Sequence, residues 1–286
     1  MLIKKNYVGK PTTAEKAACA LFPELGYAAV MKCFRKKDVK VNGARVGKSD
    51  TVNPGAEVAV YAPEAALKKV DIVYADERIA VVNKPQGMQS VGEDSAETAL
   101  SKQLGKTVFP VHRLDTNTAG LIIFALDNAA EERLVKAFRE REIEKKYLVK
   151  VFGTPKKEEG VFEDWFRKDS ASGLVEVSAK QGFGVSAVTA YKTLSTFEGT
   201  SILEVTLITG RTHQIRASMA FHGLPVVGDG KYGDFYKNKK FNRKKQCLVS
   251  NYIKFNIPND DKELGYLNGK ILKLEPGEAK KVLGEF

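Results

Sequence analysis

The chain has 286 residues, a formal net charge of +11 and 43% hydrophobic residues. This length and hydrophobic content allow a sizeable core, in one large domain or in a main domain with a small one, and exclude a disordered chain. Apolar runs stay well short of the roughly 20 residues of a membrane helix, and the first residues show no apolar signal-peptide stretch, so we expect a cytoplasmic protein with no membrane partner.

Residues 1–62 have the pattern of a small α/β module. Apolar spacing predicts two helices between residues 13 and 37. Asn42-Gly43, flanked by short alternating runs, predicts a tight β-hairpin. A Pro-Gly turn then introduces a last strand, which ends the module.

This order of a helix pair, an Asn-Gly hairpin and a "PG-x-x-V-x-V" strand resembles the αL-motif RNA-binding domain named after a ribosomal small-subunit protein. Such domains grip structured RNA with a basic helical face, and residues 1–62 hold eleven Lys or Arg against five Asp or Glu. The resemblance therefore implies a small RNA-binding domain over 1–62, with Lys32, Arg35, Lys36 and Lys37 on the RNA side. The alternative for these four residues is an ordinary solvated helix end.

Residues 63–286 alternate strand-like and helix-like segments after a predicted linker at 63–70. Because long helices are too few for a doubly wound parallel sheet, we predict an α+β domain with a mixed, largely antiparallel sheet and flanking helices. The helix over 128–142 is expected to place Leu134, Val135 and Phe138 on one face. The predicted strands are 71–76, 78–84, the apolar run from Gly120, 144–152, 187–194 and 202–209, and the other predicted helices are 96–104 and 211–223.

A second basic segment, residues 236–245, holds six Lys or Arg and no acidic residue, with Tyr236 and Phe241 interleaved. Basic side chains bind phosphates, and aromatic rings can stack on bases. Taken alone, such a segment is more often a solvated loop. Two separate basic regions together favour a nucleic-acid partner.

Two dense polar clusters could carry chemistry. His112, Arg113 and Asp115 directly precede a strongly apolar run, where burying a charge costs several kcal/mol unless the charge is paired or used. The second cluster, "TGRTHQIR" at 209–216, contains Arg211 among other polar residues. Structural roles are an equal alternative from composition alone, because Asp115 could cap a turn and Arg211 could be a surface cation.

The sequence shows no pattern typical of a metal site or a redox cofactor. Three cysteines show no metal-ligand spacing, and three histidines include no pair at i, i+4. The "GFG" and "GDGKYG" segments lack the strand–helix context of a nucleotide-binding loop, so we interpret them as turns. We expect no metal and no cofactor, and chemistry that depends on a carboxylate.

Four ordered motifs resemble those of the RluA-type pseudouridine synthases, and they span most of residues 71–255. They are "NKPQGM", "HRLD" followed by "T-x-G-L", "EKKYLV", and "LITGRTHQIRASMAFHGLPVVGDGKYG". The family converts a uridine in RNA to pseudouridine by detaching the base, turning it and rejoining it through carbon 5. The resemblance therefore implies a pseudouridine synthase catalytic domain over 63–286.

By this resemblance Asp115 is the catalytic carboxylate, and whether it attacks the sugar or removes a sugar proton stays open. Arg211 matches the family arginine that pairs with the aspartate, and a neighbouring cation lowers a carboxylate pKa by about 1–3 pH units. Tyr147 matches the aromatic residue that stacks on the target base. Arg113 would fill the space that a flipped base leaves in the RNA, and Ile208 would supply an apolar wall beneath the base.

The implied partner is RNA, with large-subunit ribosomal RNA expected rather than transfer RNA and with no obligate protein partner. One alternative is a non-catalytic RNA-binding or ribosome-assembly protein that uses the same surfaces. Another is a carboxylate-dependent hydrolase, which would need a second carboxylate at about 5–9.5 Å. No partner carboxylate stands out in the sequence.

Overall fold

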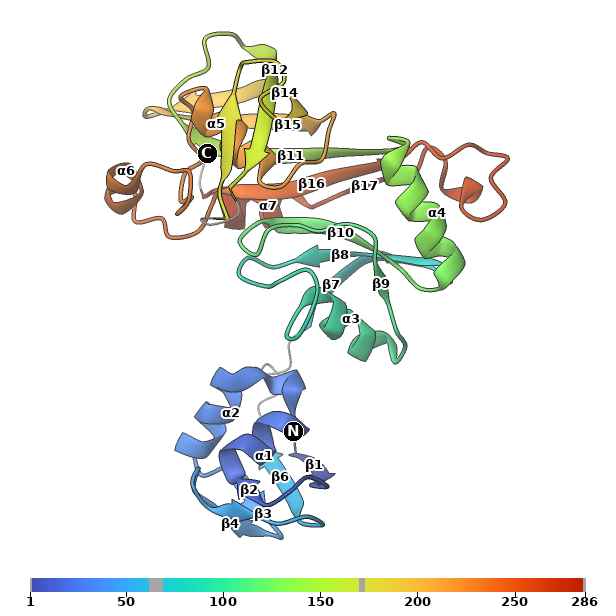
Figure 1. The fold of residues 1–286 in the computed structure, drawn as a ribbon, viewed down its shortest axis with the longest axis vertical. Coiled ribbons are helices and arrows are strands. Elements are labelled where there is room, and N and C mark those ends of the chain that lie inside the picture. The colour runs from blue at the N-terminus through green and yellow to red at the C-terminus, as the bar shows by residue number, and fades with distance from the viewer. Residues whose placement is uncertain (1, 62–68, 170–172, 285–286) are drawn as a thin grey trace. The chain divides into compact units, whose positions relative to one another are not determined.

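The computed structural model describes residues 2–61, 69–169 and 173–284 (Figure 1). The chain divides into two compact units, one of Met1–Lys69 with Val91–Gly105 and one of Val70–Ser90 with Lys106–Phe286. Most of the expected linker at 63–70 lies outside the described residues. The domain boundary after residue 62 therefore stays a prediction.

The first unit contains a small sheet and short helices. Asn42 and Gly43 join β3 to β4 with φ angles of 48° and 83°, which is the left-handed pair that a two-residue hairpin turn requires. The hairpin is thus confirmed. The sheet order is β1 (Leu2–Asn6), β6 (Glu57–Tyr61), β3 (Val39–Val41), β4 (Ala44–Arg45), and the remaining elements are β2 (Thr12–Thr13), α1 (Ala14–Leu21), α2 (Gly26–Arg35), β5 (Thr51–Val52) and α3 (Ala96–Leu104).

The second unit is built on one large mixed sheet, and neighbouring strands in it are antiparallel except for β10 and β16. The predicted α+β fold with a mixed, largely antiparallel sheet is confirmed. Across the sheet the strands are β13 (Val175–Ser178), β12 (Glu159–Lys168), β14 (Val185–Phe197), β15 (Thr200–Leu207), β11 (Ile143–Phe152), β16 (Leu248–Phe255), β10 (Ala119–Ala125), β8 (Ile79–Lys84) and β7 (Asp71–Ala75). Two short strands, β9 (Phe109–Pro110) and β17 (Ile271–Lys273), pair with β10 and β16.

The parallel contact between β10 and β16 is short and depends on a glycine. Ala119 and Gly120 pair with Val249 and Ser250, and no further pair of the two strands is in register. Gly120 has a φ of 108°, and a Cβ there would lie 2.1 Å from the carbonyl oxygen of Ser250. Only glycine permits this approach, so this residue joins the two halves of the sheet.

The same junction aligns residues from three strands. Ser250 on β16 pairs with Gly120 on one side and with Tyr147 of β11 on the other. The register of β11 against β16 shifts between Lys146 and Tyr147, and such a bulge re-aims the side chains beside it. Tyr147 is thereby placed next to the loop that precedes β10.

Helices pack against separate parts of this sheet. α4 (Asn128–Arg139) packs on β9 and β10, α5 (Gln214–Phe221) on β13 and β14, and α7 (Pro276–Leu283) on β11 and β16, while α6 (Phe235–Lys240) is a single short helix. The expected apolar face of α4 is partly wrong. Leu134 is buried, but Val135 is 50% exposed, because the next residue along a helix lies about 100° further round. The buried stripe is Ala130, Arg133, Leu134 and Ala137.

Candidate active site

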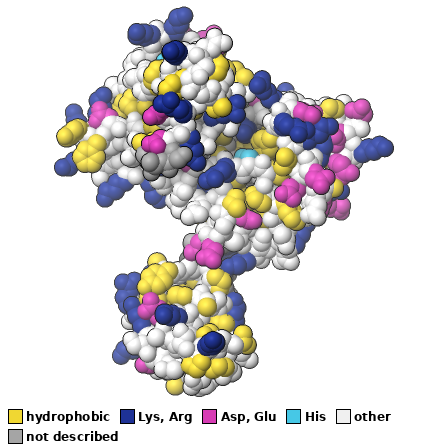
Figure 2. Space-filling view, in the orientation of Figure 1, with side chains coloured by type: hydrophobic (Ala, Val, Ile, Leu, Met, Phe, Trp, Pro, Cys, Tyr) yellow, Lys and Arg dark blue, Asp and Glu magenta, His cyan; other side chains and the backbone are white. Residues whose placement is uncertain are grey.

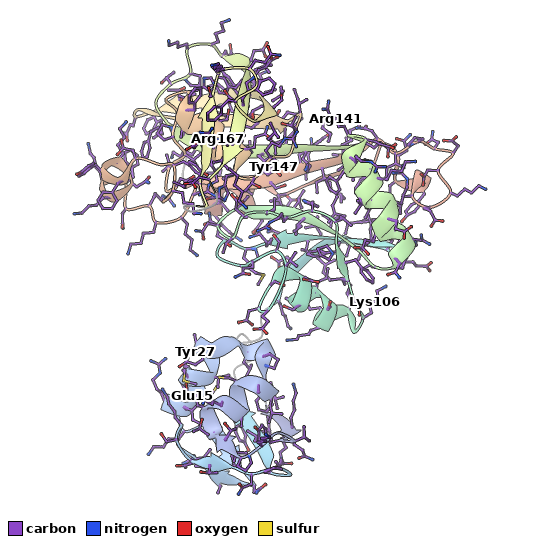
Figure 3. All side chains as sticks on the ribbon, viewed as in Figure 1. Glu15, Tyr27, Lys106, Arg141, Tyr147 and Arg167 are labelled. Carbon is purple, nitrogen blue, oxygen red and sulfur yellow. The ribbon has the colours of Figure 1, made fainter. Side chains whose placement is uncertain are left out.

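A cleft of about 590 Å³ lies where β11, β16 and the loop before β10 meet. Its walls include Asp115, Tyr147, Arg211 and Arg216, and Figure 3 shows Tyr147 in the interior of the larger unit. The cleft falls within the roughly 300–1,000 Å³ of small-molecule sites. Its polar side chains converge from segments that are up to about a hundred residues apart.

The loop that carries Asp115 is held by buried polar groups. Ser90 Oγ donates to the carbonyl of Leu114 at 2.8 Å and accepts from its N–H at 3.0 Å. The fully buried Lys84 Nζ donates to the carbonyls of Met88 at 2.7 Å and Thr116 at 3.1 Å. Burial lowers the pKa of Lys84 to about 8, although the charge of Asp115 favours the protonated form. This rigid loop presents the Asp115 carboxylate to the cleft.

Arg216, not Arg211, is the partner of Asp115. Arg216 Nη1 donates to Asp115 Oδ2 at 2.8 Å. Arg211 is exposed, and its Nε donates instead to the carbonyl of Ser186 at 3.0 Å. The expected pairing is wrong because Arg211 precedes α5, whereas Arg216 lies within that helix and points inward.

The far side of Arg216 is clamped by a second carboxylate. Nε and Nη2 donate to the two oxygens of Asp229 at 2.7 and 2.8 Å, and Asp229 is fully buried. Burial opposes both charges, yet these hydrogen bonds and the mutual attraction lower the pKa of Asp229 and raise that of Arg216. The bidentate geometry leaves Nη1 aimed at Asp115. Asp229 thus orients the cation that faces the cleft.

His213 lies beside the same carboxylate and is held by Tyr232. Tyr232 Oη accepts from the N–H of Val175 at 2.8 Å, so its own hydrogen is free to donate to His213 Nδ1, also 2.8 Å away. Burial lowers the pKa of His213, in part countered by Asp115. The other ring nitrogen, Nε2, lies 3.9 Å from Asp115 Oδ1.

The other histidines have structural contacts. His112 Nε2 accepts the N–H of Ile123 at 2.9 Å, and burial together with the charge of Lys145 lowers its pKa well below the ordinary value. His222 ends α5 and contacts Asp164 at 2.8 Å. Both side chains are therefore held by contacts within the protein.

Tyr147 is 5% exposed and lines the cleft from β11. Burial raises the pKa of its phenol above the ordinary value, so the ring stays neutral. Leu207 and Leu248 form apolar parts of the same wall. Ile208 does not line this cleft but lines the neighbouring pocket, whereas Leu207 lines both. The structure therefore does not place Ile208 in the wall of this cleft, where Leu207 lies instead.

The expected RNA-facing cations are all at the surface. Arg113 is exposed and lines the mouth of the cleft. Lys32, Arg35, Lys36 and Lys37 are exposed at the C-terminal end of α2 in the first unit. Figure 2 shows Lys and Arg side chains spread over the visible surface of both units.

The described residues contain neither a candidate metal site nor a candidate membrane-spanning helix. No group of three or more His, Cys, Asp or Glu side chains in the described ranges could hold a metal ion. No helix among these residues is long and apolar enough to cross a membrane.

Comparison with known proteins identifies the family. The family model described as RNA pseudouridylate synthase matches residues 78–221, which is half of the chain. The chain belongs to this family. The synthase is thus an RNA-modifying isomerase, and its resemblance to the RluA-type enzymes is confirmed by its relatives.

Two relatives and one solved structure illustrate the match. "Ribosomal large subunit pseudouridine synthase C" of Rickettsia bellii is 31% identical over 242 residues, covering 75% of this chain and 80% of the relative. "Dual-specificity RNA pseudouridine synthase RluA" of Yersinia pestis is 37% identical over 173 residues, covering 56% and 81%. The structure of human RNA pseudouridylate synthase domain containing 4 has a TM-score of 0.59 at 23% identity, covering 74% of this chain and 92% of its own. That structural likeness shows the shared fold.

Sequence reasoning missed three residues of this site. Arg216 stands in the polar cluster at 209–216 but had no assigned role, although its i+5 spacing from Arg211 already placed it inside the predicted helix. Asp229 lies in "GDGKYG", which was interpreted only as a turn. Lys84 lies in "NKPQGM" as the last residue of the predicted strand 78–84, and its complete burial was not predicted.

Proposed function

We propose that the synthase isomerises uridines of large-subunit ribosomal RNA, with Asp115 as the reacting carboxylate. The observation that carries this proposal is the chain Asp229–Arg216–Asp115, which ends on a carboxylate in a cleft of nucleotide size. Arg216 offers Asp115 a fixed positive partner, so the carboxylate is compensated without being covered: its side chain is 25% exposed. A flipped uridine can enter the cleft and reach it.

Tyr147 and Arg113 take complementary roles in this proposal. The buried, neutral ring of Tyr147 stacks on the target base within the cleft. Arg113, exposed at the mouth, enters the space that the flipped base leaves in the RNA. Leu207 replaces Ile208 as the apolar support of the base.

The first unit serves RNA binding in this scheme. Residues 2–61 contain a helix pair, the Asn42-Gly43 hairpin and a last strand, which supports this role, and the four exposed cations at the end of α2 suit contact with RNA phosphates. An appended module of this kind, together with a relative named for the ribosomal large subunit, favours ribosomal over transfer RNA. Such an enzyme works in the cytoplasm.

The test uses total RNA from a strain that lacks the protein. The RNA is incubated with the wild-type protein or with Asp115→Asn, which keeps the shape of the side chain and removes its charge, and pseudouridine is then mapped chemically. We expect new pseudouridines in large-subunit ribosomal RNA with the wild-type protein and none with the variant. New sites confined to transfer RNA would overturn the proposed substrate, and equal maps for the two proteins would overturn the role of Asp115.

A further inference from the structure

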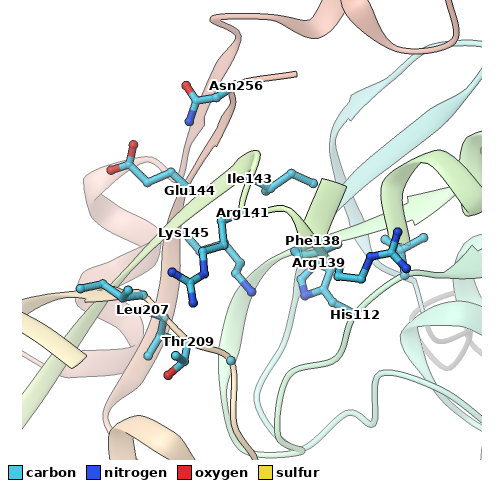
Figure 4. Close-up of a pocket in the computed structure, with 13 residues that line it drawn as sticks. His112, Phe138, Arg139, Arg141, Ile143, Glu144, Lys145, Leu207, Thr209 and Asn256 are labelled. Carbon is cyan, nitrogen blue, oxygen red and sulfur yellow. The ribbon is translucent and has the colours of Figure 1, made fainter. Parts of the chain in front are cut away.

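A second pocket, of about 530 Å³, adjoins the active-site cleft (Figure 4). It lies between the turn after α4 and the segment that follows β15. Four residues, His112, Lys145, Leu207 and Gly210, line both pockets. Only one layer of residues therefore separates the two, and the roles assigned above to Asp115, Tyr147 and Arg216 do not involve the second pocket.

Two cations face into this pocket without a carboxylate partner. Figure 4 shows Arg141 and Lys145 pointing into the same space, with Leu207 and Thr209 near them. Within the described ranges, Arg141 makes no side-chain hydrogen bond or ion pair, and the Lys145 ammonium contacts only the ring of Phe138, 4.7 Å from its centroid. Burial lowers the pKa of Lys145 to about 8. A bound anion would relieve this unfavourable burial.

The remaining charged groups at the pocket do not neutralise these cations. The Glu144 carboxylate lies 3.9 Å from the ammonium of Lys146 and points away in Figure 4. Arg139 adds a further positive charge, and its guanidinium is 4.0 Å from Glu140. His112 is neutral, as described above.

Arg141 is also held in a costly backbone conformation. It follows the end of α4 with a φ of 62°, in the left-handed region where glycine is the ordinary residue. The N–H groups of Arg141 and Glu142 donate to the carbonyls of Phe138 and Ala137 at 3.4 and 2.9 Å. The turn itself would accept glycine. The arginine side chain is therefore not required by the turn, and we attribute it to a contact outside the turn.

We propose that this second pocket binds the nucleotide that adjoins the target uridine, with Arg141 and Lys145 on its phosphate and Ile208 and Leu207 against its base. The proposal rests on the proposed function, because it assumes that the target uridine occupies the cleft with Asp115. Guanidinium and ammonium groups bind phosphate. Ile208 is 39% exposed and supplies an apolar surface to the pocket. The continuity of the RNA backbone makes an adjoining nucleotide the occupant.

The experiment measures how Arg141→Gly changes RNA binding and turnover. Glycine suits the left-handed position, so the variant keeps the turn and loses only the side chain. With large-subunit ribosomal RNA transcripts we expect KM to rise about tenfold while kcat stays within about twofold. Lys262→Gln is the matched control, because Lys262 is exposed and lines neither pocket. Its KM should not change.

A phosphate contact also predicts a change in salt dependence. We would measure dissociation constants for the same transcripts between 50 and 200 mM salt, comparing Asp115→Asn with Asp115→Asn combined with Arg141→Gly. Loss of one phosphate contact should reduce the slope of log K against log salt by about 0.7–1. An unchanged slope and an unchanged KM would overturn the proposal that the second pocket binds the adjoining nucleotide. Binding is measured here without turnover, so the result does not depend on whether the wild-type protein forms pseudouridine. Pseudouridine formation by the wild-type protein is the separate test of the proposed function.

Discussion

Arg216 illustrates how a single residue can serve both folding and the active site. Asp229 fixes two nitrogen atoms of its guanidinium, and the third faces Asp115. Removing one partner of such a buried ion pair lowers the free energy of unfolding by about 3–5 kcal/mol, because the other charge stays buried without compensation. The position therefore tolerates neither loss of charge nor loss of the planar fork.

We predict that Arg216→Lys lowers turnover by about 100-fold, because an ammonium cannot keep the bidentate contact with Asp229 and hold a donor at Asp115. Arg211→Ala should keep turnover within about tenfold, since Arg211 is exposed and contacts a backbone carbonyl. Kinetics of pseudouridine formation, with thermal melting to confirm folding, would check both variants. A larger loss for Arg211→Ala than for Arg216→Lys would restore the pairing expected from the sequence.

Among the elements, β10 and β16 determine where the active site can form. Their two-residue parallel contact joins the halves of the sheet, and it places Tyr147 across Ser250 from Gly120. The loop with Asp115 leads directly into β10. The distance between the carboxylate and the aromatic wall thus depends on a close approach of two backbones.

Gly120→Ala should lower the free energy of unfolding by at least about 2 kcal/mol, since the new Cβ meets a backbone oxygen that has no room to move. Gly199→Ala is the matched control. Gly199 also has a positive φ, 72°, but a Cβ there meets nothing within 4 Å, so only the backbone strain of about 1 kcal/mol remains. Denaturant unfolding would compare the two, and equal losses would contradict the steric argument.

At the scale of the whole molecule, the positive charge is shared between two compact units. The first unit carries exposed cations at the end of α2, and the second carries the cleft and the basic segment 236–245. Lys237, Lys239 and Lys240 in this segment lie on α6, beside the strongly exposed rings of Phe235 and Tyr236. Both regions suit RNA, and their contributions can be separated by substitution.

We predict that RNA binding weakens when Lys32, Arg35, Lys36 and Lys37 are all replaced by Ala. The slope of log K against log salt should fall by about 3, while kcat stays unchanged. All four side chains are exposed, so the fold should persist. The control removes the same number of charges from 236–245, at Lys237, Lys239, Lys240 and Arg243. Filter binding at several salt concentrations would check the prediction, and a slope that changes only in the control would assign RNA binding to the second unit alone.

The sequence by itself determined the fold class, many of the elements and part of the candidate site. Hydrophobic periodicity and turn residues act over a few positions, so the strand that begins around Gly120, the Asn42-Gly43 hairpin and the helix after Arg211 could all be predicted. The ordered motifs also placed Asp115 and Tyr147 among the candidate residues.

Only the tertiary structure decided which side chains meet. Asp115 and Arg216 are 101 residues apart, and choosing between Arg211 and Arg216 requires the direction in which α5 points its side chains. Leu207 and Ile208 differ by one position, yet Leu207 lines both pockets and Ile208 lines only the second. The buried Asp229 shows its role only through the clamp on Arg216. Packing between segments that are far apart in the chain determines each of these contacts, and local sequence patterns do not predict such packing.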